Sequence, residues 1–157
     1  MEGKRTMDPE IAHQVFRFRR DIAAPVERIF AALADASARA VWSCPSPTAV
    51  VLYDAADFRV GGEDRFRCGA REDPRFSGHT TYLAIQPPLR IVSAETVSTG
   101  GVFLAASLIT TELAAQGERT RLEMTVQVTS LCGEGMLRGT EAGTNTALDN
   151  LVRFLTA

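Results

Sequence analysis

Two ionisable side chains, Glu141 and His79, have the types and predicted positions that a small-molecule site requires. Glu141 falls on the stripe of a predicted amphipathic helix where an apolar residue is expected, so its carboxyl group should face the interior. An unpaired carboxyl there tends to stay protonated, and it could anchor a ligand or act as a general acid or base. His79 shares the parity of Thr81, Leu83 and Ile85 in a predicted strand, and it could anchor a ligand or move protons near neutral pH.

Both residues also have plain structural interpretations. Glu141 could lie near the mouth of a cavity, in water, or it could pair with an arginine such as Arg65. His79 could be a satisfied histidine of a sheet. Catalysis requires the two side chains to reach one substrate atom, and their separation in the sequence does not decide this. We therefore expect a protein without evident catalysis and keep an enzyme that uses Glu141 and His79 as the alternative.

The element that would carry Glu141 is a helix predicted from 134 to 155. Its stripe at helical spacing consists of Leu137, Glu141, Thr144, Leu148, Leu151 and Leu155. The second half of this stripe is apolar, whereas the first half offers a carboxyl and a hydroxyl group. This change predicts a helix that closes over a core at one end and roofs a cavity at the other.

Glycines recur every fourth residue in the first half of the same helix. They are Gly135, Gly139 and Gly143. Each costs the helix up to about 1 kcal/mol relative to alanine. We hypothesise that this half of the helix is soft and opens to admit a ligand.

The chain before this helix alternates as the strands of an antiparallel sheet do. The predicted strands cover 13–22, 49–53, 63–68, 77–85, 90–97, 102–113 and 120–128, with a polar loop at 71–75. Short turns join successive strands, which implies antiparallel pairing. Ala24-Pro25 begins a helix that buries Leu33, and 37–41 adds a second short helix. The fold class is therefore α+β, a curved antiparallel sheet wrapped around the long C-terminal helix.

Large side chains on this framework supply the walls of the expected cavity. The candidate ligand-binding residues are Trp42, Tyr53, Phe66, His79, Phe103, Met124, Glu141, Thr144 and Leu148. Pockets for small molecules are mostly apolar with a few placed polar groups, and this set has that character. Core packing alone would explain any single member.

Composition excludes several other classes of protein. The 157 residues carry a net charge of -2, which argues against nucleic acid as a partner because phosphate binding needs an excess of basic residues. No apolar run approaches the roughly 18 residues of a membrane helix. We expect a single domain over 11–157 after a flexible extension over 1–10. The polar N-terminus, starting at Met1 or Met7, leads us to expect a cytoplasmic protein.

Motifs for cofactor or metal chemistry are missing from the sequence. It has no Gly-x-Ser-x-Gly elbow, no His-Glu-x-x-His and no dinucleotide fingerprint. The two histidines, His13 and His79, disfavour a histidine-rich metal site. Three widely spaced cysteines fit reduced thiols better than a disulfide framework or a metal site. We expect no cofactor and no metal; a homodimer stays open.

Several short stretches, taken in order, resemble a known family. They are 22–30 (IAAPVERIF), 58–62 (FRVGG) with Phe66, 87–92 (PPLRIV), 120–122 (TRL) and 147–151 (ALDNL). The sequence resembles bacterial homologues of the heat-shock-protein-90 ATPase activator, within the START-like (SRPBCC, birch-pollen-allergen-like) helix-grip superfamily. The resemblance covers residues from about 13 to 157.

This resemblance implies a deep, mainly hydrophobic cavity between sheet and helix, in a superfamily that binds lipids, sterols and polyketides. The chain departs from its relatives at Val41-Trp42, where they often carry paired tryptophans, and at Thr144, where they often carry a tryptophan. The second departure, the loss of a bulky ring at Thr144, favours a larger or more polar cavity. The leading hypothesis is binding of a small hydrophobic or amphipathic molecule, lipid-like or aromatic. The alternatives are a cyclase- or hydratase-type enzyme and a chaperone-associated stress-response partner module.

Overall fold

The computed structural model describes residues 11–156, so the extension expected over 1–10 lies outside the described residues. The elements are β1 (Ala12–Ile22), α1 (Val26–Ala34), α2 (Ala36–Trp42), β2 (Ala49–Ala55), β3 (Glu63–Ala70), β4 (Asp73–Gln86), β5 (Arg90–Thr99), β6 (Val102–Gln116), β7 (Arg119–Ser130) and α3 (Glu134–Thr156). No helix in this range is both long enough and apolar enough to cross a bilayer.

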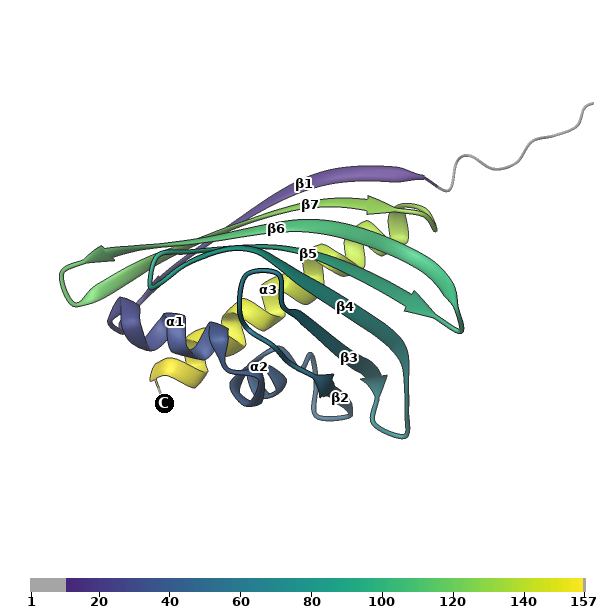
Figure 1. The fold of residues 1–157 in the computed structure, drawn as a ribbon, viewed down its shortest axis with the longest axis horizontal. Helices are drawn as coiled ribbons and strands as arrows, with labels where there is room; N and C mark the ends of the chain where they lie inside the picture. The colour runs from purple at the N-terminus through teal and green to yellow at the C-terminus, as the bar shows by residue number, and fades with distance from the viewer. Residues whose placement is uncertain (1–10, 157) are drawn as a thin grey trace, which may run out of the picture.

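The strands form one curved sheet in the order β1-β7-β6-β5-β4-β3-β2, and every neighbouring pair is antiparallel. Figure 1 shows this sheet arching over α3, with α1 and α2 beside the C-terminal end of that helix. The predicted α+β helix-grip architecture is therefore confirmed. The short turns of the sequence force the meander, and the long last helix covers its apolar face.

The core lies between the concave face of the sheet and the second half of α3. Leu148, Leu151 and Leu155 of α3 are almost fully buried, together with Ile22, Ile29 and Leu122 from β1, α1 and β7. The backbone of α3 comes close to β1 and β7, whereas no comparable approach to β4, β5 or β6 occurs within the described residues. The helix therefore crosses one side of the sheet and leaves the other side less covered.

The polar loop predicted at 71–75 is wrong. Ala70 pairs with Asp73, so Arg71 and Glu72 alone form the turn, and β4 begins at Asp73. Gly69 supplies the extra residue of a bulge just before this turn at a φ of 130°, a conformation that glycine adopts without strain. Charged side chains at the end of a long hairpin point to solvent. Their sequence is therefore as polar as that of a loop, which explains the wrong prediction.

Candidate functional site

A row of polar side chains crosses the concave face of the sheet. Asp64 pairs with Thr80, Thr80 with Glu95, and Glu95 with Ser107, on the four consecutive strands β3 to β6. Residues directly opposite one another project from the same face of a sheet. Asp64 and Thr80 are buried, which identifies this face as the one turned toward the core. We call these four residues the polar row.

One end of the polar row is saturated with hydrogen bonds. The Arg39 guanidinium donates to Asp64 Oδ2 at 2.8 Å, the Tyr82 hydroxyl donates to the same oxygen, and the Asp57 amide donates to Oδ1 at 3.1 Å. The Asp64 side chain is only 2% exposed. Burial and the hydrogen bond to Asp64 raise the pKa of Tyr82 well above its ordinary value of 10.0. Asp64 is therefore a charge that the protein has already neutralised internally.

Arg39 joins this end of the row to the helices. Its Nη1 atom donates to the carbonyl oxygens of Leu33 and Ala34 at 2.9 and 2.8 Å, which satisfies groups at the end of α1. Its Nε atom donates to the Tyr53 hydroxyl at 3.2 Å, and its guanidinium carbon lies 4.9 Å from the centre of the Tyr53 ring. The pair of Arg39 and Asp64 is thus a structural clamp that fixes α1 and α2 to β2, β3 and β4.

The other end of the row is not saturated. Glu95 accepts one hydrogen bond, from the Thr80 hydroxyl at 3.4 Å, and lies deep in the fold. Burial raises the pKa of Glu95 above its ordinary value of 4.5, and the nearby Asp64 charge adds to this effect. Glu95 nevertheless keeps part of its surface accessible. Burial therefore makes the neutral form of Glu95 more favourable than it is in water, and a neutral carboxyl can donate a hydrogen bond.

Free hydroxyl groups flank Glu95 on the same face. Ser107 lies opposite Glu95 on β6, and Ser93 lies two residues before it on β5. Neither hydroxyl has a hydrogen-bond partner among residues 11–156. In this range the only enclosed side-chain polar atom without a partner is Arg121 Nε, so both hydroxyls must have some contact with solvent. The centre of the concave face therefore borders space that water can enter.

The middle of α3 is less buried than the residues on either side of it. Leu137 and Leu148 are buried, but every residue from 138 to 147 is half-buried or exposed. At 1.5 Å per residue, this stretch spans about 15 Å. We use the name inner hollow for the region between this stretch and the centre of the polar row.

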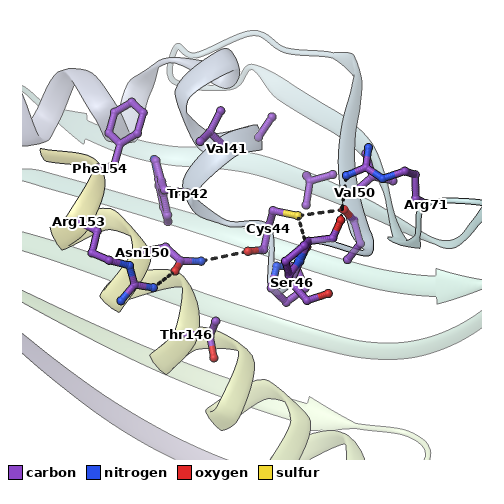
Figure 2. A pocket seen from close by; sticks show the side chains of 15 residues that line it. Val41, Trp42, Cys44, Ser46, Val50, Arg71, Thr146, Asn150, Arg153 and Phe154 are labelled. Carbon is purple, nitrogen blue, oxygen red and sulfur yellow. Dashed lines mark hydrogen bonds between the residues drawn. The ribbon is translucent and has the colours of Figure 1, made fainter. Parts of the chain in front are cut away.

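A groove opens between α3 and the β2 edge of the sheet. Its cavity volume is about 830 Å³, and it lies between the end of α2, the 44–47 loop, the start of β2 and the last turns of α3. Figure 2 shows Trp42 and Val41 on the α2 side, Phe154 and Arg153 on α3, and Arg71 across the groove. We call this feature the outer groove. A hydrogen bond of 3.0 Å from the Asn150 amide to the Cys44 carbonyl ties its two walls together.

The inward orientation predicted for Glu141 is wrong, because Glu141 is exposed. Its angular position on the helix matches that of Leu148, yet Leu148 is buried whereas Glu141, two turns earlier, faces water. Thr144, one turn further, is half-buried. The inward carboxyl that the sequence suggested exists, but it is on β5 and not on α3.

The prediction that His79 shares the inward face of β4 with Ile85 is also wrong. A bulge at Leu83 shifts the register of β4 between Tyr82 and Ala84, so Tyr82 and Ile85 both face the core. His79 therefore projects from the outer face, where its Nε2 atom lies 2.9 Å from Glu63 Oε1. The sheet separates His79 from α3, so His79 and Glu141 cannot meet at one substrate atom.

The remaining candidate ligand-binding residues lie partly in the core and partly at the surface. Phe103 is 46% exposed because a bulge at Leu104 turns it to the outer face beside Ser98. Tyr53 and Phe66 pack together with ring centres 5.5 Å apart. Met124 and Leu148 belong to the core. Trp42 is buried, donates to the Ala32 carbonyl oxygen at 3.0 Å and borders the outer groove.

Glu95 was not predicted as a site residue, although the sequence contains a weak indication that it faces the core. It shares the parity of Ile91 and Ser93, and Ile91 is the apolar residue that marks the buried face of β5. The other parity of this strand carries Val92 and Ala94, which are equally apolar, so alternation alone could not show which face is buried.

Within residues 11–156, no three His, Cys, Asp or Glu side chains converge as metal ligands would.

Comparison with known proteins identifies relatives of the whole fold. The family model described as activator of Hsp90 ATPase homolog 1-like protein matches residues 23–156. No curated protein matches the chain.

Solved structures agree with this match. A crystal structure of a protein from Rhizobium loti is 30% identical with a TM-score of 0.82, covering 92% of this chain and 99% of its own. A structure from Rhizobium leguminosarum is 27% identical with a TM-score of 0.78, covering 93% and 96%. A third, from Chromobacterium violaceum, is 23% identical with a TM-score of 0.77, covering 91% and 97%, and shows the likeness of fold alone.

Proposed function

Since the chain belongs to the family of activator of Hsp90 ATPase homolog 1-like proteins, we propose that it uses this fold to bind a small neutral amphipathic molecule in the inner hollow. The ligand, lipid-like or aromatic, lies between the polar row and the middle of α3. Glu95 anchors its polar end, and the apolar residues of the concave face hold its body. The proposal requires binding only and no chemical step.

The observation that carries this proposal is the unsaturated centre of the polar row. The carboxyl of Glu95 and the hydroxyls of Ser93 and Ser107 face the interior without enough protein partners. None of these groups is sealed from water, so water can serve as their hydrogen-bond partner until a ligand replaces it. A ligand that carries a carbonyl, ether or hydroxyl oxygen would complete these hydrogen bonds.

The charges around Glu95 favour a neutral ligand. Asp64 is the nearest charged carboxylate, and the Arg39 guanidinium is already committed to Asp64, Tyr53 and the end of α1. An anionic ligand would therefore enter the hollow without a free cation to meet it. A cationic ligand would lose its hydration beside a carboxyl whose charged form burial disfavours.

Two uncharged probes, decanol and naphthol, test the proposal by calorimetric titration. Ser107→Phe fills the inner hollow and should abolish binding of both, whereas Leu108→Phe, at the next position but on the outer face, should leave binding unchanged. Glu95→Leu removes the polar anchor and should weaken naphthol binding about ten-fold. Glu95→Gln keeps a donor at the same place and should retain most of the affinity.

Equal affinity of the Ser107→Phe and Leu108→Phe variants for the probes would contradict binding in the hollow. Absence of saturable binding by the unmodified protein would contradict the function itself. Circular dichroism of each variant separates loss of binding from loss of fold.

A further inference from the structure

The geometry points to a second ligand site beside the inner hollow: the outer groove binds a small amphipathic carboxylate, with the guanidinium groups of Arg71 and Arg153 on its two sides attracting the anionic head and the apolar wall between them holding the chain. Its volume of about 830 Å³ lies in the range of small-molecule pockets. Nothing in the function proposed for the inner hollow uses this groove.

Unbalanced positive charge is the first argument. Arg71 and Arg153 border the groove, and no acidic residue lines it. Neither arginine forms an ion pair with a carboxylate within the described residues. The chain as a whole is negative, at -2, and most of its other arginines pair with a neighbouring acid. Two uncompensated guanidinium groups beside one concavity favour an anion.

The guanidinium groups of Arg71 and Arg153 are also held in place by neutral hydrogen-bond acceptors. Arg71 Nη2 donates to the Pro47 carbonyl at 3.1 Å, and Arg153 Nη2 donates to the Asn150 side-chain oxygen. Both anchors are neutral acceptors, and each leaves most of the five donors of its guanidinium unused. The side chains are therefore oriented along the groove without being neutralised. Figure 2 shows Arg153 on α3 and Arg71 on the opposite side of the groove.

An exposed apolar wall between the arginines is the third argument. Val41 is 63% exposed and Phe154 is 41% exposed, although both are large apolar side chains. Together with Trp42 and Val50 they line the groove. A contiguous apolar surface rimmed by polar groups marks a site of interaction. The combination of apolar wall and cations suits a carboxylate on an apolar chain, and it suits a neutral or cationic amphiphile less well.

Decanoate tests this inference by amide NMR titration of the uniformly labelled protein. We expect saturable binding of one molecule per chain, with the largest shift changes at Val41, Val50 and Phe154. Arg153→Gln and Arg71→Gln should each weaken binding by up to about ten-fold, because each removes one of the two positive charges that border the groove. Arg138→Gln, an exposed arginine on the same helix away from the groove, is the matched control and should bind as the unmodified protein does.

Val41 offers a charge test that does not threaten the fold, because its side chain is mostly exposed. Val41→Asp should weaken decanoate binding, whereas Val41→Lys should preserve or strengthen it. Decyltrimethylammonium, with the same chain and the opposite charge, should bind much more weakly than decanoate. Equal binding of the two amphiphiles, or equal affinity of the Asp and Lys variants, would overturn the inference.

The hollow and the groove are separated by one further variant. Ser107→Phe should leave decanoate binding intact while it removes naphthol binding. If Ser107→Phe removes decanoate binding and the arginine variants do not, decanoate occupies the inner hollow and the outer groove is not its site.

Discussion

Thr80 and Glu95 lie directly opposite each other on β4 and β5, and the Thr80 hydroxyl donates to Glu95 Oε1 at 3.4 Å. This single long hydrogen bond is the protein's own compensation for a carboxyl group placed deep in the fold. Asp64, the other acid of the polar row, has three donors. The contrast between the two acids separates the structural clamp at Asp64 from the ligand site that we propose at Glu95.

Glu95 makes the stability of the protein depend on pH. Its pKa in the folded state is raised above the ordinary value of 4.5 by burial, so the folded state holds the proton more tightly than the unfolded chain. The resulting stabilisation is complete at pH values below the unfolded pKa and is lost as the pH rises through the folded pKa. Glu95→Gln should remove this decline in the free energy of unfolding, measured by urea titration from acid to neutral pH.

Glu63 is the control for this pH dependence, because its pKa is shifted the other way. The hydrogen bond from His79 lowers the pKa of Glu63, so its contribution is present above the unfolded pKa and is lost as the pH falls. Glu63→Gln should therefore leave the decline in place. A Glu95→Gln variant with the same pH profile as the unmodified protein would contradict the assignment.

Breaking the clamp between Arg39 and Asp64 should be strongly destabilising. Asp64→Ala leaves the buried Arg39 guanidinium without its carboxylate and should cost about 3–5 kcal/mol in the free energy of unfolding, measured with urea. Asp54→Ala removes the acid of an exposed pair with Arg67 and should cost far less. Comparable losses in the two variants would show that the clamp contributes no more than a surface pair.

Packed and unpacked parts of the concave face should respond in opposite ways to added volume. A methyl group on Gly78 would overlap the Phe66 ring, so Gly78→Ala should cost about 1–3 kcal/mol. Ser107→Phe adds a far larger side chain but enters the inner hollow, and it should be tolerated or stabilising. Thermal unfolding of both variants checks this order, and a larger loss for Ser107→Phe than for Gly78→Ala would mean that the hollow is filled.

The first half of α3 should be the less stable half. A Cβ at Gly139 or Gly143 meets no atom within 4 Å, so Gly139→Ala should stabilise the protein by up to about 1 kcal/mol through helix propensity. The same change should slow amide hydrogen exchange around it. Protection of Gly139 in the unmodified protein as strong as that of Leu151 would remove the hypothesis that this half opens for a ligand.

Sequence patterns predicted the fold because turn chemistry and helical periodicity are local properties. The meander of strands, the short helix after Pro25 and the long last helix all follow from spacing along the chain. The site residues were harder to predict from the sequence, because bulges at Leu83 and Leu104 reverse the faces of His79 and Phe103. A bulge depends on pairing with a neighbouring strand, and a single sequence does not reveal it.

The position of α3 relative to the sheet is the second property that local patterns do not contain. Glu141 has the helical angle of Leu148, yet Glu141 is exposed whereas Leu148 is buried. The polar row likewise arises only when four strands align in register. Asp64, Thr80, Glu95 and Ser107 have no shared spacing in the sequence that would group them.

Intermolecular nuclear Overhauser effects between naphthol and the protein's methyl groups are the most direct test of ligand binding in the inner hollow. Val97 and Ile109 lie on the concave face beside Glu95 and Ser107, whereas Val41 and Val50 line the outer groove. We predict contacts from naphthol to Val97 and Ile109 and none to Val41. Contacts confined to Val41 and Val50, or no contact with any methyl group of the concave face, would contradict the central claim.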